Sequence, residues 1–290
     1  MLLRRKPFKG YVSGRKRPEW SILMSDLFAL PYPVLPHELS RYAFLFDIDG
    51  TLSGLRPTPG EVQINDTVTR FLAFLSQRRI PFALISGRSI LDIDTLFLSH
   101  DVPCAGVHGA EIRYADGKYE RLAICGSDVA HVWERLKLAC MRYPALRLEN
   151  KLISFAIHFR DAPELAAVAM WTAASLAELY PDTFAVQHGK FVCELRPVKA
   201  SKGAAVEKMM MSPAFCGRTP VYVGDDITDE TAFRAVNEME GFSVKVGDEE
   251  TSATHRLKDV CGVHRWLDDL MASAAAGCRV PAQGADKRSS

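Results

Sequence analysis

The chain has 290 residues and a formal net charge of +1, and 48% of its residues are hydrophobic and 24% charged. These are the proportions of a folded globular protein, which excludes disorder throughout and a nucleic-acid-binding charge spread along the whole chain. No uncharged apolar run reaches about 18 residues, which excludes a membrane-spanning helix.

The basic residues are concentrated at the N-terminus. Residues 1–17 contain Lys and Arg but no acidic residue, and residues 30–37 are rich in Pro. We expect residues 1–40 to form a basic leader and an extended linker, with Met24 as an alternative start. The leader has no nucleic-acid recognition motif, so we expect no nucleic-acid partner. The 7 cysteines form no CxxC pair, which favours reduced thiols and a cytoplasmic location.

Strand and helix patterns alternate after the linker. Short apolar runs predict buried parallel strands at 42–46, 82–85 and 102–107. Apolar residues at helical spacing predict helices at 68–75 and 90–98 between them. This β-α-β-α-β order predicts a parallel sheet with right-handed crossovers.

The pattern changes in the middle of the chain. Hairpins are expected at 111–122 and 183–195, helices at 129–139 and 163–179, and a strand at 152–159. These elements describe an α+β insert rather than a continuation of the parallel sheet.

The first pattern then returns, with helices at 201–211 and 228–237 and strands at 221–223 and 242–246. The fold class we predict is α/β, a doubly wound, Rossmann-like parallel sheet with an inserted α+β cap domain. The expected boundaries are 41–109 for the first part of the core, 110–196 for the cap, 197–271 for the second part of the core and 272–290 for a flexible tail.

The first acidic motif, Asp47-Ile48-Asp49-Gly50-Thr51, directly follows the first strand. Ligands of open α/β sheets bind at this edge, and residues i and i+2 leave a strand on the same side. Asp47 and Asp49 are therefore expected to face one pocket. An EF-hand would need its Gly at the sixth loop position rather than the fourth, which excludes a calcium sensor of that type.

A second acidic motif, Gly224-Asp-Asp-Ile-Thr-Asp-Glu230, follows the strand at 221–223. Two like charges about 4 Å apart repel by about 4 kcal/mol at an effective dielectric constant near 20, so this edge needs a cation. Carboxylate oxygens and open water positions favour Mg²⁺ over zinc. The alternative for Asp229 is a helix cap.

Two further polar groups are expected at the same edge. Ser86, in Ser86-Gly87-Arg88, follows the second strand and offers a hydroxyl group to a phosphate, or else it caps a helix. Lys202 stands at a helix start, where the helix dipole disfavours a cation. Its position makes sense if it offsets an aspartate and a phosphoryl group.

Over residues 41–270, these four motifs resemble the haloacid-dehalogenase (HAD) superfamily of phosphotransferases. The resemblance implies that Asp47 attacks phosphorus to form an aspartyl-phosphate, and that Asp49 acts as general acid and then as general base. It implies Mg²⁺ bound by the Asp47 carboxylate, the Asp49 carbonyl and Asp225, with Asp229 supporting the site. The residues implied to bind phosphate are Thr51, Ser86 and Lys202.

Three segments narrow the resemblance further: Gly106-Val-His-Gly-Ala-Glu111, the run from Gly189 to Pro197, and the second acidic motif with Thr228. They are similar to the trehalose-6-phosphate phosphatase family, which implies trehalose 6-phosphate as substrate and an insert that closes as a lid. The alternative for each substrate-binding candidate in these segments is a surface charge or a hinge salt bridge. The substrate-binding residues that we expect are Arg88, Glu111, Lys190, Glu194 and Arg196.

Two other functions stay open. One is a phosphatase for another sugar phosphate, such as sucrose or mannosylglycerate phosphate. The other is a sugar-phosphate-binding regulator without turnover, which the presence of both Asp47 and Asp49 disfavours. Non-covalent association with a trehalose-phosphate synthase is also open.

Overall fold

The computed structural model describes four stretches of the chain. These are residues 30–36, 38–56, 61–189 and 191–277. All of the helices and strands below lie in the compact unit that begins at Tyr32. The basic leader with Met24, the expected site residue Lys190, and residues 278–290 lie outside the described residues.

The strands form two separate sheets, one of eight strands and one of four. In spatial order the large sheet contains β12 (His255–Leu257), β11 (Phe242–Val246), β10 (Thr219–Gly224), β1 (Tyr42–Phe46), β2 (Phe82–Ile85), β3 (Cys104–Gly106), β4 (Glu111–Arg113) and β5 (Tyr119–Arg121). The six strands from β12 to β3 are parallel, whereas β4 and β5 continue the sheet as an antiparallel hairpin. Strand β1 lies in the interior, between β2 and β10, which are far apart in the sequence.

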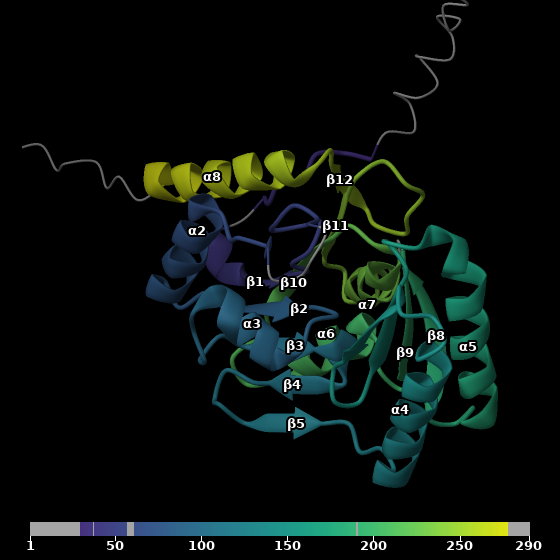
Figure 1. Cartoon of the computed structure of the whole chain (residues 1–290). Helices are drawn as coiled ribbons and strands as arrows, with labels where there is room; N and C mark the ends of the chain where they lie inside the picture. The colour runs from purple at the N-terminus through teal and green to yellow at the C-terminus, as the bar shows by residue number, and fades with distance from the viewer. Residues whose placement is uncertain (1–29, 37, 57–60, 190, 278–290) are drawn as a thin grey trace, which may run out of the picture. The chain divides into compact units, whose positions relative to one another are not determined.

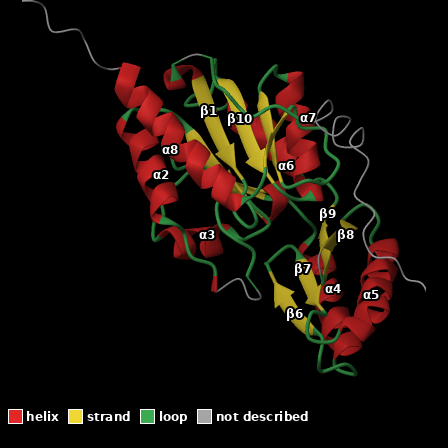
Figure 2. Ribbon diagram, turned by 90° about the horizontal axis from the view of Figure 1, so that it is seen from above, coloured by secondary structure: helices red, strands yellow, loops and turns green. Residues whose placement is uncertain are grey.

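Helices cover both faces of the large sheet, which confirms the doubly wound core (Figures 1 and 2). One face carries α2 (Asp66–Gln77), α3 (Ile90–Phe97) and α8 (Val260–Gly277), and the other carries α6 (Lys202–Met211) and α7 (Glu230–Glu238). Because successive strand residues point to opposite faces, Phe44 of β1 packs with Phe71 of α2, whereas Leu45 shares a cluster with Phe233 of α7. Burial on both faces explains why the strands are continuous apolar runs.

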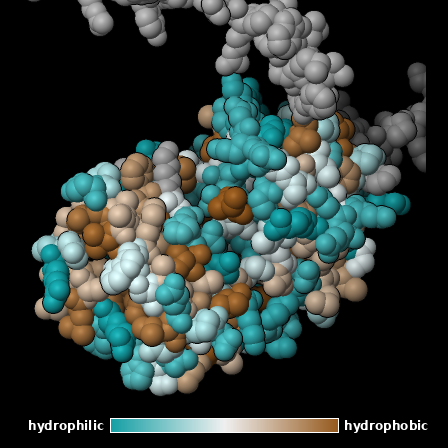
Figure 3. Space-filling model, turned by 90° about the vertical axis from the view of Figure 1, so that its right-hand side faces the viewer, coloured by the Kyte–Doolittle hydropathy of each residue, from teal (hydrophilic) through white to brown (hydrophobic). Residues whose placement is uncertain are grey.

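The four-stranded sheet belongs to the insert and is antiparallel throughout. Its elements are α4 (Gly126–Cys140), β6 (Arg147–Asn150), β7 (Phe155–His158), α5 (Ala166–Leu179), β8 (Phe184–Gly189) and β9 (Val192–Pro197). Phe155, Phe184 and Leu195 contribute to an apolar cluster that is separate from the clusters of the large sheet. Figure 3 shows the side of the molecule that carries α5, where hydrophobic side chains form several separate patches between polar ones. The α+β insert predicted from the sequence is therefore confirmed, and it has a separate sheet and a separate hydrophobic core.

Single-turn 3₁₀ helices complete the described structure. They are η1 (Leu39–Arg41), η3 (Val107–Gly109), η4 (Pro163–Leu165) and η5 (Ile227–Asp229). The last of these precedes α7 directly, so the expected helix at 228–237 is divided into a 3₁₀ turn and an α-helix.

Three parts of the structure differ from the sequence-based expectation. The hairpin at 111–122 pairs with β3, so its assignment to the insert is wrong. Three elements are not predicted by the sequence. These are strand β6, which pairs with the expected strand at 152–159, strand β12 and helix α8. Because α8 continues to Gly277, residues 272–277 are helical rather than part of a flexible tail. The domain boundaries otherwise stay predictions.

Among the described helices, none combines the length and the apolar character that crossing a membrane requires. The six cysteines that the structure describes all have free thiols, as the absence of paired spacing predicts.

The packing of α8 leads to a testable prediction. The Trp266 side chain is 1% exposed, and its indole N–H donates to the Pro33 carbonyl over 2.8 Å. We expect Trp266→Ala to lower the free energy of unfolding by about 3–5 kcal/mol, because it leaves a large cavity and removes a buried hydrogen bond. Urea-induced unfolding measures this loss.

A matched control is available on the insert. Trp171 of α5 is 73% exposed, and its replacement by Ala should change the free energy of unfolding by less than about 0.5 kcal/mol. Similar losses in the two variants would contradict the burial of α8.

Candidate active site

The site is built at the carboxyl edge of the large sheet, around Asp47. This residue follows β1, its N–H donates to the Val223 carbonyl of β10 over 2.9 Å, and its side chain is buried. After Asp49 the chain turns at Gly50, whose φ is +88°. A Cβ atom at this position would lie 2.0 Å from Asp225 Oδ2, so only glycine lets the first motif approach the second this closely.

Three carboxylates from the two acidic motifs meet at this edge. One oxygen each from Asp47, Asp225 and Asp229 lies within 4.8 Å of the other two. Lys202, the first residue of α6, places its Nζ 2.8 Å from Asp47 Oδ1 and 2.7 Å from Asp229 Oδ1. One buried cation therefore faces three acidic side chains. The structure thus brings together four of the five aspartate and lysine positions that the sequence singles out, namely Asp47, Asp225, Asp229 and Lys202.

The Asp229 carboxylate is fully engaged within the protein. Besides Lys202, its Oδ1 accepts from the Tyr222 hydroxyl over 2.6 Å. Its Oδ2 accepts from the backbone N–H groups of Asp225 and Asp226, each over 3.0 Å. Since both oxygens already accept two hydrogen bonds each, Asp229 supports the site and orients Lys202, while Asp47 and Asp225 are left to face a ligand.

The buried charges shift the acidities of this cluster. Burial raises the pKa of Asp47 well above its ordinary value; Lys202 opposes this, and Asp229 and Asp225 add to it. Burial, followed by the charge of Asp229, raises the pKa of Asp225 to about 6. Burial disfavours the charged form of Lys202, but Asp229 and Asp47 outweigh it and raise its pKa. The positive charge of Lys202 thus does not offset the charges of Asp47 and Asp225, and the carboxylate oxygens of these two residues are suitable ligands for a hard divalent cation.

Asp49, the expected acid and base, is held by Arg88. The Arg88 guanidinium donates from Nε to Asp49 Oδ2 over 2.6 Å and from Nη2 to Oδ1 over 2.7 Å. This two-bond contact fixes the plane of the Asp49 carboxyl group. The structure thus places Arg88, expected to bind substrate, against the catalytic candidate at the same edge.

Ser86 and Thr51 also lie at this edge. The Ser86 side chain is buried after β2 and accepts from the Arg88 N–H over 3.2 Å. Ser89, rather than Ser86, caps α3, so the helix-cap alternative for Ser86 is wrong. The Thr51 hydroxyl donates to Asp225 Oδ1 over 3.2 Å and so orients a ligand-facing carboxylate.

Two of the expected substrate-binding residues are engaged in holding the fold. Glu111 is buried, with Oε2 accepting from the Ile90 N–H at the start of α3 and Oε1 accepting from Arg121 of β5. Arg196 donates to Gln187 Oε1 over 2.9 Å and to the Ala200 carbonyl. These contacts match the salt-bridge or hinge alternative, and Glu194 also forms an ion pair, with Lys151.

Glu194 lies where the insert meets the core. Its Oε2 accepts from Lys151 Nζ over 3.1 Å, and its Oε1 accepts from the Ser154 hydroxyl. Lys151 also donates to the Gly87 carbonyl of the core over 3.2 Å. Burial favours the neutral form of Glu194, but Lys151, ahead of His108, lowers its pKa below the ordinary value. A charged pair is therefore held in a largely water-free junction.

Lys151 and its neighbour Glu149 belong to this junction but to none of the motifs that the sequence singles out. Glu149 Oε2 lies 2.7 Å from His158 Nε2, and its charge, after that of Glu194, supports the charged form of Lys151. The signal was present, because Glu149 and Lys151 stand at i and i+2 at the end of a strand, as Asp47 and Asp49 do. Since β6 contains no apolar run, however, its sequence does not predict a strand.

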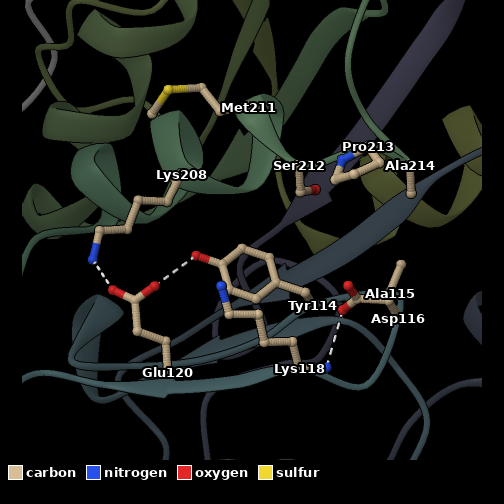
Figure 4. A pocket seen from close by; sticks show the side chains of 10 residues that line it. All are labelled: Tyr114, Ala115, Asp116, Lys118, Glu120, Lys208, Met211, Ser212, Pro213 and Ala214. Atoms are coloured by element: carbon tan, nitrogen blue, oxygen red, sulfur yellow. Dashed lines mark hydrogen bonds and ion pairs between the residues drawn. The ribbon is translucent and has the colours of Figure 1, made fainter.

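A cavity of about 620 Å³ lies elsewhere, between the β4–β5 hairpin and the end of α6 (Figure 4). Its polar side chains bind one another: Glu120 accepts from Tyr114 and from Lys208. Since β4 runs antiparallel to β3, the turn after β4 lies at the edge of the sheet opposite Asp47. This cavity is therefore separate from the carboxylate cluster.

Comparisons with known proteins agree on one family. The family model described as trehalose-phosphatase matches residues 45–260. The trehalose-6-phosphate phosphatase of Escherichia coli (strain K12) is 38% identical over 239 residues, which cover 82% of this chain and 90% of the relative. A probable trehalose-phosphate phosphatase of Sinorhizobium fredii is 37% identical over 218 residues, which cover 73% and 80%.

Solved structures resemble the same fold. The C-terminal domain of Candida albicans trehalose-6-phosphate phosphatase superposes with a TM-score of 0.73 at 24% identity, covering 84% of this chain and 98% of that chain. A haloacid dehalogenase-like hydrolase from Bacteroides thetaiotaomicron gives a TM-score of 0.59 at 15% identity, covering 79% and 99%. At these identities the structural likeness shows the fold alone, and it is the HAD fold.

The bonding of Asp229 predicts a large effect on stability. We expect Asp229→Asn to lower the free energy of unfolding by about 3 kcal/mol or more, because it removes a buried anion from Lys202. Urea-induced unfolding measures this loss. Asp182→Asn, at an exposed position of the insert, is the control and should change the free energy by less than about 0.5 kcal/mol. An equally small effect at Asp229 would contradict its supporting role.

Proposed function

The chain belongs to the trehalose-phosphatase family, and we propose that it hydrolyses trehalose 6-phosphate with Asp47 as nucleophile and Asp49 as acid and base. Family membership makes it a phosphoric monoester hydrolase. The single observation that supports the assignment of residues is the buried Asp47 carboxylate, held 2.8 Å from Lys202 at the carboxyl end of β1. This is where ligands of open α/β sheets bind.

The side chains divide the reaction between them. An Asp47 oxygen forms a bond to phosphorus as the bond from phosphorus to the sugar oxygen breaks, which gives an aspartyl-phosphate. Asp49 donates its proton to the departing sugar alkoxide and then takes a proton from the water that attacks phosphorus. This attack breaks the bond between phosphorus and the Asp47 oxygen, which releases phosphate and restores the Asp47 carboxylate. Arg88 keeps the Asp49 carboxyl group in one orientation through both steps. Ser86 and Lys202 would bind phosphoryl oxygens.

Mg²⁺ is the cation that we propose for the carboxylate cluster. The Asp47 carboxylate, the Asp49 main-chain carbonyl and Asp225 would hold it, with Thr51 and Asp229 supporting Asp225. When bound, it would offset the buried negative charge and stabilise charge on the transferred phosphoryl group.

The junction of core and insert suits the sugar part of the substrate. Glu149, Lys151 and Glu194 present charged groups there, and charged groups form strong hydrogen bonds to hydroxyls. We propose that Arg88, Lys190, Glu194, Glu149 and Lys151 contact the substrate. Glu111 instead links β4 to α3 and β5 within the core, and Arg196 joins β9 of the insert to Ala200, just before α6. A cytoplasmic location, with free thiols, and association with a trehalose-phosphate synthase stay predictions.

Phosphate release from a panel of sugar phosphates tests the substrate. We expect kcat/KM for trehalose 6-phosphate to exceed that for sucrose 6-phosphate, mannosylglycerate phosphate and glucose 6-phosphate by about 100-fold. This factor corresponds to about 3 kcal/mol, the worth of one or two hydrogen bonds to charged groups. Equal rates on all four would overturn the specific substrate but leave the phosphatase activity.

The same assay tests the nucleophile. Asp47→Asn should reduce phosphate release by about 10³-fold or more and still unfold cooperatively, because the amide has the same shape but cannot attack phosphorus. Turnover close to that of the unsubstituted protein would refute this role. Trehalose 6-phosphate binding without any turnover in the unsubstituted protein would favour the regulator instead.

Metal binding can be measured without activity. Saturation with Mg²⁺ to about 100 times its Kd should raise the free energy of unfolding by about 2.7 kcal/mol at pH 7.5. Asp225→Asn should abolish most of this gain. Asp226→Asn is the matched control, because this neighbouring carboxylate is exposed and should leave the gain intact. Loss of the gain in the Asp226 variant alone would reassign the ligand.

The gain should also depend on pH. Because the pKa of Asp225 is raised to about 6, the folded protein without metal binds this proton more tightly than the unfolded chain. Asp225 therefore lowers the stability of the metal-free protein as pH rises from about 4 to above 6. The stabilisation by Mg²⁺ should accordingly be larger at pH 7.5 than at pH 5.

A further inference from the structure

The turn after β3 has an unusual backbone conformation. Val107, His108 and Gly109 have φ values of +49°, +55° and +97°. A β-branched residue in this region is an outlier, and each such residue costs about 1–3 kcal/mol, so the surroundings must impose the conformation. The Val107 N–H donates to the Arg88 carbonyl over 2.8 Å, and the His108 N–H donates to the Ser86 carbonyl over 2.9 Å. The turn is thus bonded to the phosphate-side loop, residues 86–88.

The His108 imidazole lies against this loop. It is 9% exposed, and a Cβ atom at position 87 would lie 2.7 Å from His108 Nε2, so the ring occupies the space that Gly87 leaves. Among the described residues, none forms a hydrogen bond with His108 Nδ1, although this atom is buried. A histidine that only filled the core would be expected to have both nitrogens paired.

The other ring nitrogen faces the insert. His108 Nε2 lies 3.7 Å from Glu194 Oε2, within range of an ion pair but longer than a hydrogen bond. The same carboxylate is held by Lys151, which also reaches the Gly87 carbonyl. One polar contact from the insert therefore reaches the loop at residues 86–88 directly, and a second reaches the imidazole that packs against Gly87.

We propose that His108 is a positioning residue of the phosphatase reaction. It holds Glu194 over the phosphate-side loop, and this contact couples closure of the insert to the placement of Arg88. A movement of less than about 1 Å would turn the 3.7 Å contact into a hydrogen bond. Since a carboxylate can only accept, such a hydrogen bond requires a proton on Nε2. Through the Val107 N–H, the same turn holds the backbone of Arg88, which orients Asp49.

The inference rests on the proposed function, and the test compares two substrates. Trehalose 6-phosphate engages the insert, whereas p-nitrophenyl phosphate offers it no sugar. Asn tolerates the left-handed conformation, so His108→Asn keeps the turn while its shorter side chain no longer reaches Glu194. We expect kcat/KM for trehalose 6-phosphate to fall about tenfold and that for p-nitrophenyl phosphate to stay within about twofold.

A double-mutant cycle separates positioning from general destabilisation. If His108 acts through Glu194, the double variant His108→Asn with Glu194→Gln should lose no more trehalose 6-phosphate activity than Glu194→Gln alone. His108→Gln, whose amide reaches further, should recover part of the loss. His131→Asn, at an exposed position of α4, is the matched control and should leave both activities unchanged.

Each outcome decides the matter. Equal losses of kcat/KM on the two substrates would overturn the proposal and leave His108 a structural residue. The same conclusion would follow if the fold-losses of His108→Asn and Glu194→Gln multiplied in the double variant. If His108→Asn fails to fold, the same comparison with His108→Gln decides, and equal losses overturn the proposal there too. An unsubstituted protein that hydrolyses p-nitrophenyl phosphate but not trehalose 6-phosphate would instead overturn the substrate of the proposed function.

Discussion

The buried Lys202 between Asp47 and Asp229 is the interaction on which the site depends. Removing a charge from water costs several kcal/mol, and the opposite charges recover it only in good geometry with further hydrogen bonds. Lys202 meets this condition through contacts of 2.8 and 2.7 Å, and Asp229 meets it through four donors. One cation cannot neutralise Asp47 and Asp225 as well. The remaining negative charge makes the edge of the sheet a place for a metal ion and a phosphoryl group.

The order of strands explains how residues 47, 86 and 225 come together. Strand β1 lies between β2 and β10, so the ends of three parallel strands meet at one edge. This much could be predicted from the sequence, because each polar motif follows an apolar run and parallel strands share an edge. The hairpin at 111–122 could not be assigned in this way, because alternation predicts a hairpin but not the sheet that it joins. Strand β6, with the sequence Arg-Leu-Glu-Asn, carries no apolar run, and its pairing with β7 comes from tertiary contacts.

The candidate site shows the same division. Asp47, Asp49 and Asp225 could be predicted because their chemistry is visible in short motifs at strand ends. Lys151 and His108 could not, since their roles depend on the insert lying against the loop at 86–88. Glu111 is the opposite case. Its place in a motif predicts a substrate-binding role, whereas in the structure its carboxylate accepts hydrogen bonds from the Ile90 N–H and from Arg121. Local sequence reports which chemistry is present, and long-range contacts decide which groups are already occupied.

The division of the hydrophobic core indicates how the insert can respond to substrate. The large sheet and the insert have separate apolar clusters. Within the part of the chain that the structure describes, only the small cluster of Val107, Ala110, Ile153 and Ala200 joins residues of both. Moving the insert therefore exposes little apolar surface, and its polar contacts with the core can be exchanged for contacts with sugar hydroxyls at little net cost. The proposed closure of the insert needs a contact that couples the position of the insert to the reacting groups. Glu194 faces His108, and the neighbouring Val107 N–H is bonded to the Arg88 carbonyl. Arg88 in turn contacts Asp49. In the proposed closure, the insert is therefore coupled to Asp49 through His108, Val107 and Arg88 rather than across the whole core.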